Sequence, residues 1–398
     1  MSRRRTAAGR RPRRVEPRSP ALTTILAQWG RIGCVGFGGP PAHIALLREL
    51  CVERRAWLTE EDFEHGVAAT NLLPGPASTQ LAIYCAWRLR GAAGAILGGL
   101  GFIVPGLVLI ILLAVPFVAA APPEWIRGAG AGAGAVVAAV AVQAGVRLVP
   151  GSWRRMRSEQ RRRWVAYLAA GAIATALLGP WLVAVLLACG VIELGLGRRT
   201  RPGALAVHGW PALAVAAGAT GGLAALCWTA FKVGALSYGG GFVIIPLMQA
   251  DAVENYHWMT DGQFLNAVAL GQATPGPLVR SVAVVGYAAA GLGGAILASV
   301  VAFAPSFLFI GIGAERFDRL RTNPRPRAFL DGAGPAAIGA IIGSAIPLGL
   351  ALTEAWQLAV LAAGALLLFV LRLGVVWTLL AAGAAGALAA LAGAPLAA

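Results

Sequence analysis

The chain has 398 residues, of which 58% are hydrophobic and 13% are charged. That composition leaves too little polar surface to cover a soluble globule of this size, so it indicates an integral membrane protein. The net charge of +16 comes from arginines in short segments between apolar runs, which we interpret as topology signals rather than as a nucleic-acid-binding surface. Several apolar runs approach or reach the ~20 residues of a membrane-spanning helix, without the alternation of a β-barrel strand.

Residues 1–20 carry eight arginines and no apolar stretch. We therefore expect a basic cytoplasmic arm rather than a cleavable signal peptide. The five cysteines and four histidines are scattered along the chain without the spacing of a metal site. We expect the cysteines to be small buried side chains, and we predict no metal, haem or other cofactor.

Residues 21–90 contain two apolar helical patterns, each interrupted once. The first interruption is Gly38-Gly39-Pro40, where glycine permits a turn and proline suits the first turn of the next helix. The second is Pro74-Gly75-Pro76, which follows a helix that starts at the capping residue Thr59. We predict that each break separates two half-helices.

Four uninterrupted apolar spans follow, and the segment 151–163 among them holds six arginines and one glutamate. The spans are 91–121, 128–149, 164–179 and 181–197. One more apolar stretch, 203–220, comes before the pattern of broken helices starts again.

The broken pattern is duplicated. Pro275-Gly276-Pro277 repeats Pro74-Gly75-Pro76 after 201 residues, and between Gly33 and Pro76 the same shift makes 15 of 44 aligned positions identical. We predict four regions, which are a basic arm at 1–20, a first repeat at 21–197, a linker with an extra membrane segment at 198–221, and a second repeat at 222–398.

Loop charge indicates that the two copies have opposite orientations. The nearly neutral loop 116–127 has as its counterpart 315–327, with five arginines against two acids. The next pair reverses this pattern, since 151–163 is rich in arginine whereas 350–355 carries one acid. Because arginine-rich loops face the cytoplasm, we predict that 151–163 and 315–327 are both cytoplasmic. The fold is then an all-α polytopic membrane protein with two homologous halves in inverted topology, as is typical of secondary transporters.

Each half-helix has ~15 residues, enough for about two-thirds of the hydrocarbon thickness. Length therefore leaves two counts open. If the broken elements cross the membrane, the chain has thirteen spans, with the N-terminus inside and the C-terminus outside. If they are re-entrant hairpins, it has nine.

A backbone break at membrane depth is tolerated only where protein or a water-filled cavity satisfies the exposed groups. Four breaks in symmetry-related pairs therefore predict a central cavity. The half-helices that begin at Pro40, Pro76, Gly241 and Pro277 each present free N–H groups and a positive dipole end. This arrangement favours an anion.

The duplication also aligns Arg31 with Lys232, each inside apolar sequence, and Arg280 adds a charge just after the second Pro-Gly-Pro. A charge at membrane depth is expensive and marks a functional candidate. Snorkelling to an interface, or a structural pair with an acid, remains open. The candidate substrate-binding residues are Arg31, Gly38, Gly39, Pro40, Asn71, Pro74, Gly75, Pro76, Thr79, Lys232, Gly239, Gly240, Gly241, Gln272, Pro275, Gly276, Pro277 and Arg280.

Some of these neutral side chains are equally explained as caps of half-helices. Glu53 and Glu254 are also aligned by the duplication. They are candidates for proton coupling, and stabilising helix ends is the alternative role.

The broken motifs resemble those of the chromate ion transporter (CHR) family. In the first copy they are Gly-Phe-Gly-Gly-Pro, Trp-Leu-Thr and Leu-Pro-Gly-Pro, and in the second Ser-Tyr-Gly-Gly-Gly, Trp-Met-Thr and Thr-Pro-Gly-Pro. The resemblance covers both halves. In this respect the chain resembles the long-chain bacterial members of the family, which have two fused domains. It implies export of chromate across the bacterial cytoplasmic (inner) membrane, driven by the membrane potential or proton gradient, and hence chromate resistance.

The residues themselves predict only a secondary transporter with a cavity suited to an anion. Sulfate is a tetrahedral dianion of similar size to chromate, so a transporter or channel for another oxyanion is one alternative. A membrane-embedded enzyme is another, although no nucleotide-binding or paired metal-binding motif supports catalysis. We expect chromate or a similar oxyanion and the lipid bilayer as partners, no nucleic acid, a cytoplasmic N-terminus, and leave a homodimer open.

Overall fold

A computed structural model describes the chain in eight parts. All regular elements in these parts are helices, which confirms the all-α prediction. The described residues are 20–118, 122–154, 156, 158–177, 182–196, 221–237, 241–314 and 324–396. The predicted extra segment at 203–220 and the basic arm before residue 20 lie outside them.

The first half starts with two broken elements followed by four longer helical segments. Its helices are α1 (Leu22–Val35), α2 (Pro40–Arg48), the π-helical turn η1 (Glu49–Arg54), α3 (Glu60–Thr70), α4 (Ala77–Phe117), α5 (Glu124–Ala135), α6 (Val137–Arg154), η2 (Ser158–Gln160), α7 (Arg161–Leu177) and α8 (Leu182–Leu196).

The second half repeats this order. Its helices are α10 (Leu223–Leu236), α11 (Ile244–Gln249), the π-helical turn η4 (Ala250–Asn255), α12 (Asp261–Ala273), η5 (Leu278–Ser281), α13 (Val282–Gly313), α15 (Pro324–Gly343), α16 (Ala345–Leu350), α17 (Ala355–Ala365), η7 (Leu366–Val370) and α18 (Val375–Leu391).

The backbone repeats with the period of the sequence. The turns η1 and η4 lie 201 residues apart, and each is followed by a non-glycine residue with positive φ, Ala56 at 47° and His257 at 51°. The glycines of the two Pro-Gly-Pro motifs also match, with φ of 115° at Gly75 and 106° at Gly276. Residues other than glycine rarely adopt such backbone angles, so the turn requires glycine at these two positions.

Helix starts follow the predicted capping chemistry. Thr59 precedes α3, and its hydroxyl oxygen accepts a hydrogen bond of 3.1 Å from the backbone N–H of Asp62. Thr260 precedes α12 and forms a reciprocal capping box with Gln263. These side chains satisfy N–H groups that the helix itself leaves unpaired.

The chain reverses direction at the first break of each half. The rings of Trp29 on α1 and Trp57 after η1 stack with centroids 6.4 Å apart, whereas a continuous helix would separate them by about 40 Å. In the second half, Thr229 on α10 donates a hydrogen bond of 2.7 Å to Asp251 on η4. Both first elements are therefore hairpins.

The Pro-Gly-Pro breaks are also reversals. A Cβ on Gly66 of α3 would collide with the ring of Tyr84 on α4, and a Cβ on Gly271 of α12 would lie 2.9 Å from the Cβ of Ser281. In each pair, the two residues lie on opposite sides of the break and at about the same distance from it along the sequence. All four broken elements are therefore hairpins in the structure.

Helices α4 and α13 each contain a second sharp turn. Backbone angles leave the helical range at Arg90 and Gly91 in α4, and at Ala290 and Gly291 in α13. A Cβ on Gly94 would overlap the carbonyl oxygen of Ala86, so the chain folds back on itself there. Each element consists of a short arm that ends the hairpin and a long helix that follows it.

Four described helical segments are long and apolar enough to cross a membrane. They are Ala77–Phe117, Glu124–Arg154, Leu278–Gly313 and Pro324–Leu350. Shorter apolar helices are Leu182–Leu196, Leu223–Leu236, Ala355–Val370 and Val375–Leu391. The set includes equivalent members of both halves.

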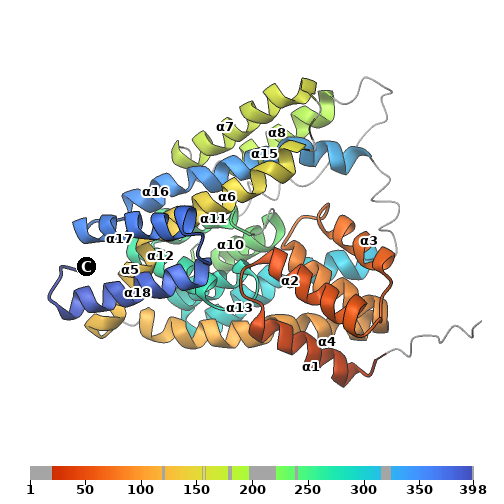
Figure 1. The fold of residues 1–398 in the computed structure, drawn as a ribbon, viewed down its shortest axis with the longest axis horizontal. Coiled ribbons are helices and arrows are strands. Elements are labelled where there is room, and N and C mark those ends of the chain that lie inside the picture. Colours follow the sequence, from red (N-terminus) through yellow and green to blue (C-terminus); the bar gives the residue numbers. More distant parts are fainter. Residues whose placement is uncertain are drawn as a thin grey trace, which may run out of the picture.

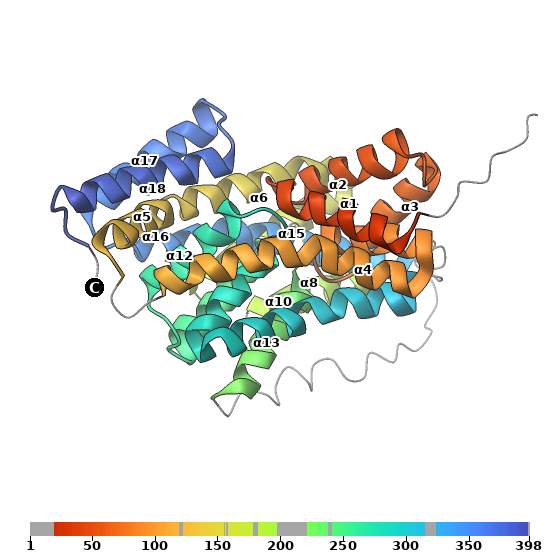
Figure 2. The ribbon, with the colours of Figure 1, turned by 90° about the horizontal axis from the view of Figure 1, so that it is seen from below.

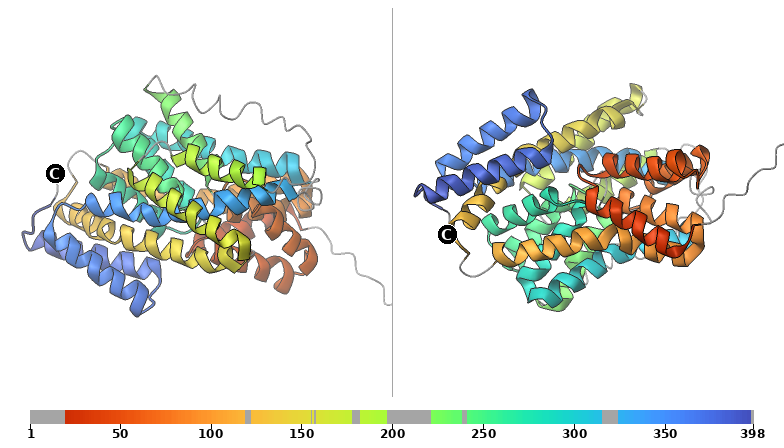
Figure 3. Two further views of the ribbon diagram at one scale, coloured as in Figure 1. Left: turned by 90° about the horizontal axis from the view of Figure 1, so that it is seen from above. Right: turned by 60° about the horizontal axis from the view of Figure 1, so that its bottom comes forward.

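The two halves interlock. Helix α5 packs along α18, whereas α15 packs along α7 and α8, so each half contributes a helix to the other (Figure 1). Small residues permit this close packing, because a Cβ on Gly132 would collide with the carbonyl oxygen of Ala382, and one on Gly171 with that of Ala336. Helices α17 and α18 form a hairpin at one edge of the molecule (Figure 3).

The long parts of α4 and α13 pack against each other and run in opposite directions (Figure 2). Helix α1 packs on α4, and its counterpart α10 packs on α13. The end of α6 and the starts of α7 and α15 lie at the same end of the molecule (Figure 1). These ends flank the arginine-rich segments 151–163 and 315–327, of which residues 315–323 are outside the described part.

Candidate functional site

The breaks of the two halves meet. The backbone N–H of Gly276, in the second Pro-Gly-Pro, donates a hydrogen bond of 2.8 Å to the carbonyl oxygen of Gly36, in the first break of the other half. In the same way, a Cβ on Gly75 would lie 3.3 Å from the carbonyl oxygen of Gly234. Each Pro-Gly-Pro turn therefore contacts the first hairpin of the opposite half.

Arg280 lies at one of these meeting points and is fully buried. It belongs to η5, directly after the second Pro-Gly-Pro. Its Nε donates a hydrogen bond of 3.0 Å to the carbonyl oxygen of Pro277, and its Nη2 donates one of 3.2 Å to that of Thr274. These bonds fix the guanidinium on its own hairpin.

The charge of Arg280 is not neutralised by any acid among the residues that the structure describes, and within that part of the chain its Nη1 has no hydrogen-bond partner. A buried charge without a counter-ion is costly, and a buried donor without an acceptor adds to the cost. The arrangement is explained if an anion occupies the remaining donor position.

Two glycines leave the space that the guanidinium occupies. A Cβ on Gly106 of α4 would collide with Nη1 of Arg280 and with the carbonyl oxygen of Pro275. A Cβ on Gly276 would lie 3.1 Å from the guanidinium carbon Cζ. Gly106 was not among the predicted site residues, because a glycine inside an apolar membrane helix carries no local signal beyond close packing.

Unsatisfied polar atoms gather on the same elements. Over the described ranges, nine buried side-chain nitrogen or oxygen atoms lack a hydrogen-bond partner, whereas such atoms are normally paired. Eight belong to the broken hairpins or to α13, namely His43 Nδ1, Thr79 Oγ1, Gln80 Oε1, Ser237 Oγ, Asn266 Oδ1, Gln272 Nε2, Arg280 Nη1 and Ser306 Oγ. Water and a transported solute are the species that would satisfy them.

Two of these atoms are related to the arginine site by the duplication. Thr79 aligns with Arg280, and Ser306 aligns with Gly106 once the single deletion after the Pro-Gly-Pro motif is taken into account. Both hydroxyl groups are fully buried. One meeting point therefore has the Arg280 cation and the space left by Gly106. The positions that the duplication aligns with these two residues carry hydroxyl donors instead.

His43, which was not among the residues predicted from the sequence, lies at the first meeting point. Its Nε2 lies 2.9 Å from the carbonyl oxygen of Gly36, the same oxygen that accepts from Gly276. Because that oxygen can only accept, Nε2 is the protonated nitrogen and Nδ1 is left as an acceptor. The ring packs edge-on against Phe102 with centroids 5.0 Å apart.

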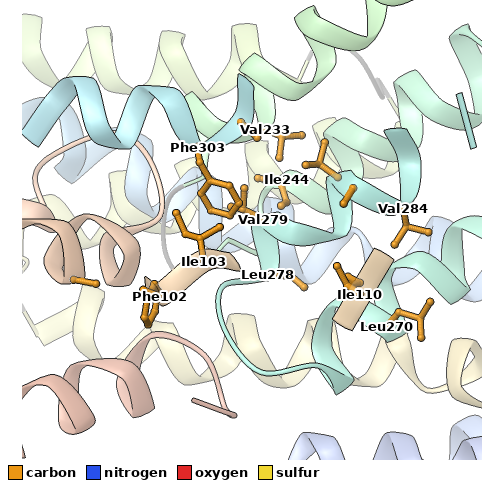
Figure 4. Close-up of a cluster of buried hydrophobic side chains, with 14 of the residues drawn as sticks. Phe102, Ile103, Ile110, Val233, Ile244, Leu270, Leu278, Val279, Val284 and Phe303 are labelled. Atoms are coloured by element: carbon orange, nitrogen blue, oxygen red, sulfur yellow. The ribbon is translucent and has the colours of Figure 1, made fainter. Parts of the chain in front are cut away.

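Apolar side chains enclose this region. Figure 4 shows Ile103 of α4 close to Phe303 of α13, which is its counterpart, with Val279 of η5 beside them. All three are buried. Exclusion of water by such side chains lowers the local dielectric constant, so that the attraction between Arg280 and an anion is stronger than it is in water.

The structure separates the predicted charged residues from one another. Arg280 is at the meeting of the breaks. Lys232 forms an ion pair of 2.5 Å with Asp251, which corresponds to the structural-pair alternative. Arg31 lies exposed on the outside of α1. Glu53 and Glu254 are also exposed, each on a π-helical turn away from the breaks.

The other predicted residues near the breaks differ in how deeply they are buried. Gly75, Pro76 and Thr79 are buried, whereas Asn71 and Pro74 are exposed. In the second half Thr274, the motif and Arg280 are buried, whereas Gln272 and Ala273 are partly exposed. Gly239 and Gly240 lie outside the described residues, and α11 starts at Ile244 after a turn, rather than at Gly241.

Comparison with known proteins identifies the family. The family model described as "Chromate transporter" matches residues 23–194 and again residues 224–387. The chain belongs to the chromate transporter family. The two matches correspond to the two halves that carry the duplicated breaks.

Three named relatives match most of this chain. A chromate transport protein of Cupriavidus metallidurans is 31% identical over 82% of this chain and 82% of its own length. One of Pseudomonas aeruginosa is 30% identical over 91% of both chains. A probable chromate transport protein of Synechococcus elongatus is 28% identical, covering 83% of this chain and 85% of its own. No solved structure matches the chain.

Proposed function

We propose that this protein is a secondary active transporter that exports chromate across the bacterial cytoplasmic membrane and thereby confers chromate resistance. The membrane potential or the proton gradient drives the export. The observation that carries the proposal is the guanidinium of Arg280, which is fully buried where two helix breaks meet and has no acid partner among the described residues. Membership of a transporter family, and the names of the relatives, support it.

Arg280 is the cation that binds the dianion. Its Nη1 is free to donate to a chromate oxygen, while Pro277 and Thr274 hold the rest of the guanidinium in place. The backbone N–H groups at the half-helix starts and the unpaired hydroxyl of Thr79 supply further donors. Such preformed donors replace part of the water shell that the anion loses.

The halves form an inverted repeat in the membrane. The antiparallel packing of equivalent helices α4 and α13 supports a two-fold axis in the membrane plane. Charge supports it as well, since the first-half hairpins have Arg54, Arg55, Arg88 and Arg90 near their outer ends. The aligned positions of the second half carry no arginine. The hairpins of the two halves therefore enter from opposite sides, with the N-terminus in the cytoplasm.

This arrangement suggests how access alternates. Hairpins that enter from opposite sides and meet at their breaks can rock against each other about the contact between Gly36 and Gly276. Rocking of one repeat against the other around a fixed midplane site is the common mechanism of transporters with inverted repeats. The anion at Arg280 would then face each side in turn.

Everted membrane vesicles test the proposal. Vesicles with the wild-type protein should accumulate labelled chromate with saturation, and an uncoupler should abolish accumulation. Arg280→Gln should lose this uptake, whereas Arg280→Lys should keep part of it because the charge remains although the fork geometry is lost. Arg31→Gln is the matched control, since that arginine is exposed.

Two results would overturn the proposal. The first is the absence of saturable chromate uptake by the wild type. The second is uptake by Arg280→Gln with unchanged rate and affinity. Competition by unlabelled sulfate in the same vesicles distinguishes a chromate-selective transporter from one for tetrahedral oxyanions in general. Substrate turnover without vesicles would indicate an enzyme instead.

A further inference from the structure

A second buried charge cluster lies in the first hairpin of the second half, away from Arg280. Asp251 of η4 is 3% exposed, and its carboxylate is 2.5 Å from Nζ of Lys232 on α10. The hydroxyl of Thr229 donates to the same carboxylate at 2.7 Å, and Nδ2 of Asn255 donates at 3.2 Å. The pair joins the entering and returning arms of the hairpin.

The first half forms the same hairpin without this pair. Leu50 occupies the position of Asp251 on the equivalent turn η1, and Arg31, the counterpart of Lys232, is exposed. The fold of the hairpin therefore does not depend on a buried ion pair. Replacing such a pair with apolar residues is often neutral or stabilising, and ionisable residues within membrane segments are usually functional.

The other ionisable groups around Asp251 do not neutralise it. Among the described residues of the elements packed against η4, α11 has no ionisable side chain, and Asp261 of α12 accepts a hydrogen bond from Gln249 instead. Tyr256 follows η4, and burial together with the negative charge of Asp251 raises the pKa of its hydroxyl, so it stays neutral. Glu254 is exposed, and Cys227 on α10 is partly exposed.

The pair is connected to the contact between the halves. Lys232 precedes Gly234 by two residues on α10, and the carbonyl oxygen of Gly234 faces the first Pro-Gly-Pro turn at Gly75. The ring of Trp228 lies 5.7 Å from the Lys232 ammonium. A change in the charge of this hairpin therefore occurs within one helical turn of the breaks.

We propose that Asp251 is a proton-binding site that is coupled to anion binding. This inference rests on the transport function proposed above, in the form in which the membrane potential drives export, because a proton bound together with chromate leaves the cell with it and against the inward proton gradient. A hydronium ion transfers its proton to the carboxylate oxygen that faces Lys232 and leaves as water, and the lysine keeps its own proton. Lys232 is then an uncompensated cation beside the breaks, and it adds to the attraction that Arg280 exerts on the dianion.

The sign of the coupling follows from charge. Protonation adds one positive charge near the anion, so each ligand strengthens the binding of the other by the same factor. Chromate affinity should therefore rise as pH falls. Couplings between two sites in one protein are commonly about 5- to 150-fold, and we expect about a tenfold change in KM. The mechanism also gives Lys232 a role in binding although it is paired in this structure.

The test uses the full-length protein in liposomes, with the KM for chromate measured from about pH 5 to about pH 9. In the wild type, KM should fall at low pH. Asp251→Asn, which cannot lose a proton, should transport with a low KM that no longer depends on this site, and Asp251→Glu should restore the dependence. Titration of chromate itself affects all three proteins equally, so the difference between them isolates Asp251.

The inference is wrong if Asp251→Asn shows the pH profile of the wild type. Should the asparagine variant fail to accumulate, uptake of protons by purified wild-type protein in weakly buffered solution decides the matter when chromate is added. Proton uptake supports the coupling, and its absence contradicts it. Saturable transport that depends on Arg280 but shows no such coupling would overturn only this inference, whereas no saturable transport at all would overturn the proposed function.

Discussion

Gly106→Ala is the most informative single change at the anion site, because it displaces Arg280 without removing any charge. The new methyl group would collide with Nη1 of Arg280 and with the carbonyl oxygen of Pro275. A flexible side chain could swing aside, but the second atom belongs to the backbone of the break. The guanidinium and the Pro-Gly-Pro turn must therefore shift together.

The expected size of the effect follows from the overlap. Forcing an extra methyl group into a closely packed site costs about 1–3 kcal/mol. If the strain falls on the anion-binding geometry, chromate affinity falls by roughly 5- to 150-fold, since about 1.4 kcal/mol corresponds to a factor of ten. The maximal rate of transport should change less than the affinity, because the cation remains in the site.

Gly311→Ala is the matched control. Gly311 lies in α13, where a Cβ would meet no atom within 4 Å. Both substitutions gain the same helix propensity, about 1 kcal/mol. The KM for chromate in everted vesicles should rise for Gly106→Ala and stay constant for Gly311→Ala. Equal KM values in the two variants and the wild type, at equal amounts of protein in the membrane, would refute the placement of Arg280 in the binding site.

Three further changes test separate parts of the account. Gly276→Leu should abolish export while the protein still accumulates, because Gly276 has a φ of 106° and binds Gly36 of the other half; export at the normal rate would show that this break is only a packing feature. Single cysteines at Ser158 and Thr322 in a cysteine-free protein should both resist an impermeant thiol reagent in whole cells, and strong labelling of one of them would contradict the inverted topology. Lys232→Gln alone should lower the melting temperature more than the double change Lys232→Gln with Asp251→Asn, because losing one partner of a buried ion pair costs about 3–5 kcal/mol. Equal decreases in melting temperature would mean that Lys232 and Asp251 do not form an ion pair.

Local chemistry made the broken helices predictable. Glycine and proline allow few alternatives to a turn at Pro74-Gly75-Pro76, and duplication of the motif showed that the turn was not incidental. The capping role of Thr59 was predictable for the same reason, since a hydroxyl before an acidic first turn satisfies the free N–H groups of a helix.

The direction of the chain after each break was not predictable from helix length. Half-helices of ~15 residues fit a crossing or a return equally well. The stacking of Trp29 on Trp57 decides the question, and it is a contact between residues that no periodicity connects. The sequence signal available was the paired tryptophan itself, which also fits a membrane interface.

The assignment of charges depended on tertiary structure most of all. Arg31 and Lys232 are equivalent in sequence, yet one is exposed and the other is paired with Asp251. Asp251 is on a π-helical turn within apolar sequence, and its partner is on a different arm of the hairpin. Arg280 was one candidate among several, and only the structure shows that it is buried and has no acid partner in the part of the chain that is described.

Direct binding of chromate to the purified protein tests the central claim most closely. Isothermal titration calorimetry of the wild type in detergent should show saturable binding of chromate. Sulfate should compete with this binding to a measurable degree. Arg280→Gln, at the same folded fraction, should show no saturable binding, while Arg31→Gln binds as the wild type does. Binding of chromate to Arg280→Gln with the wild-type Kd would contradict the claim that the anion site lies at the meeting of the helix breaks.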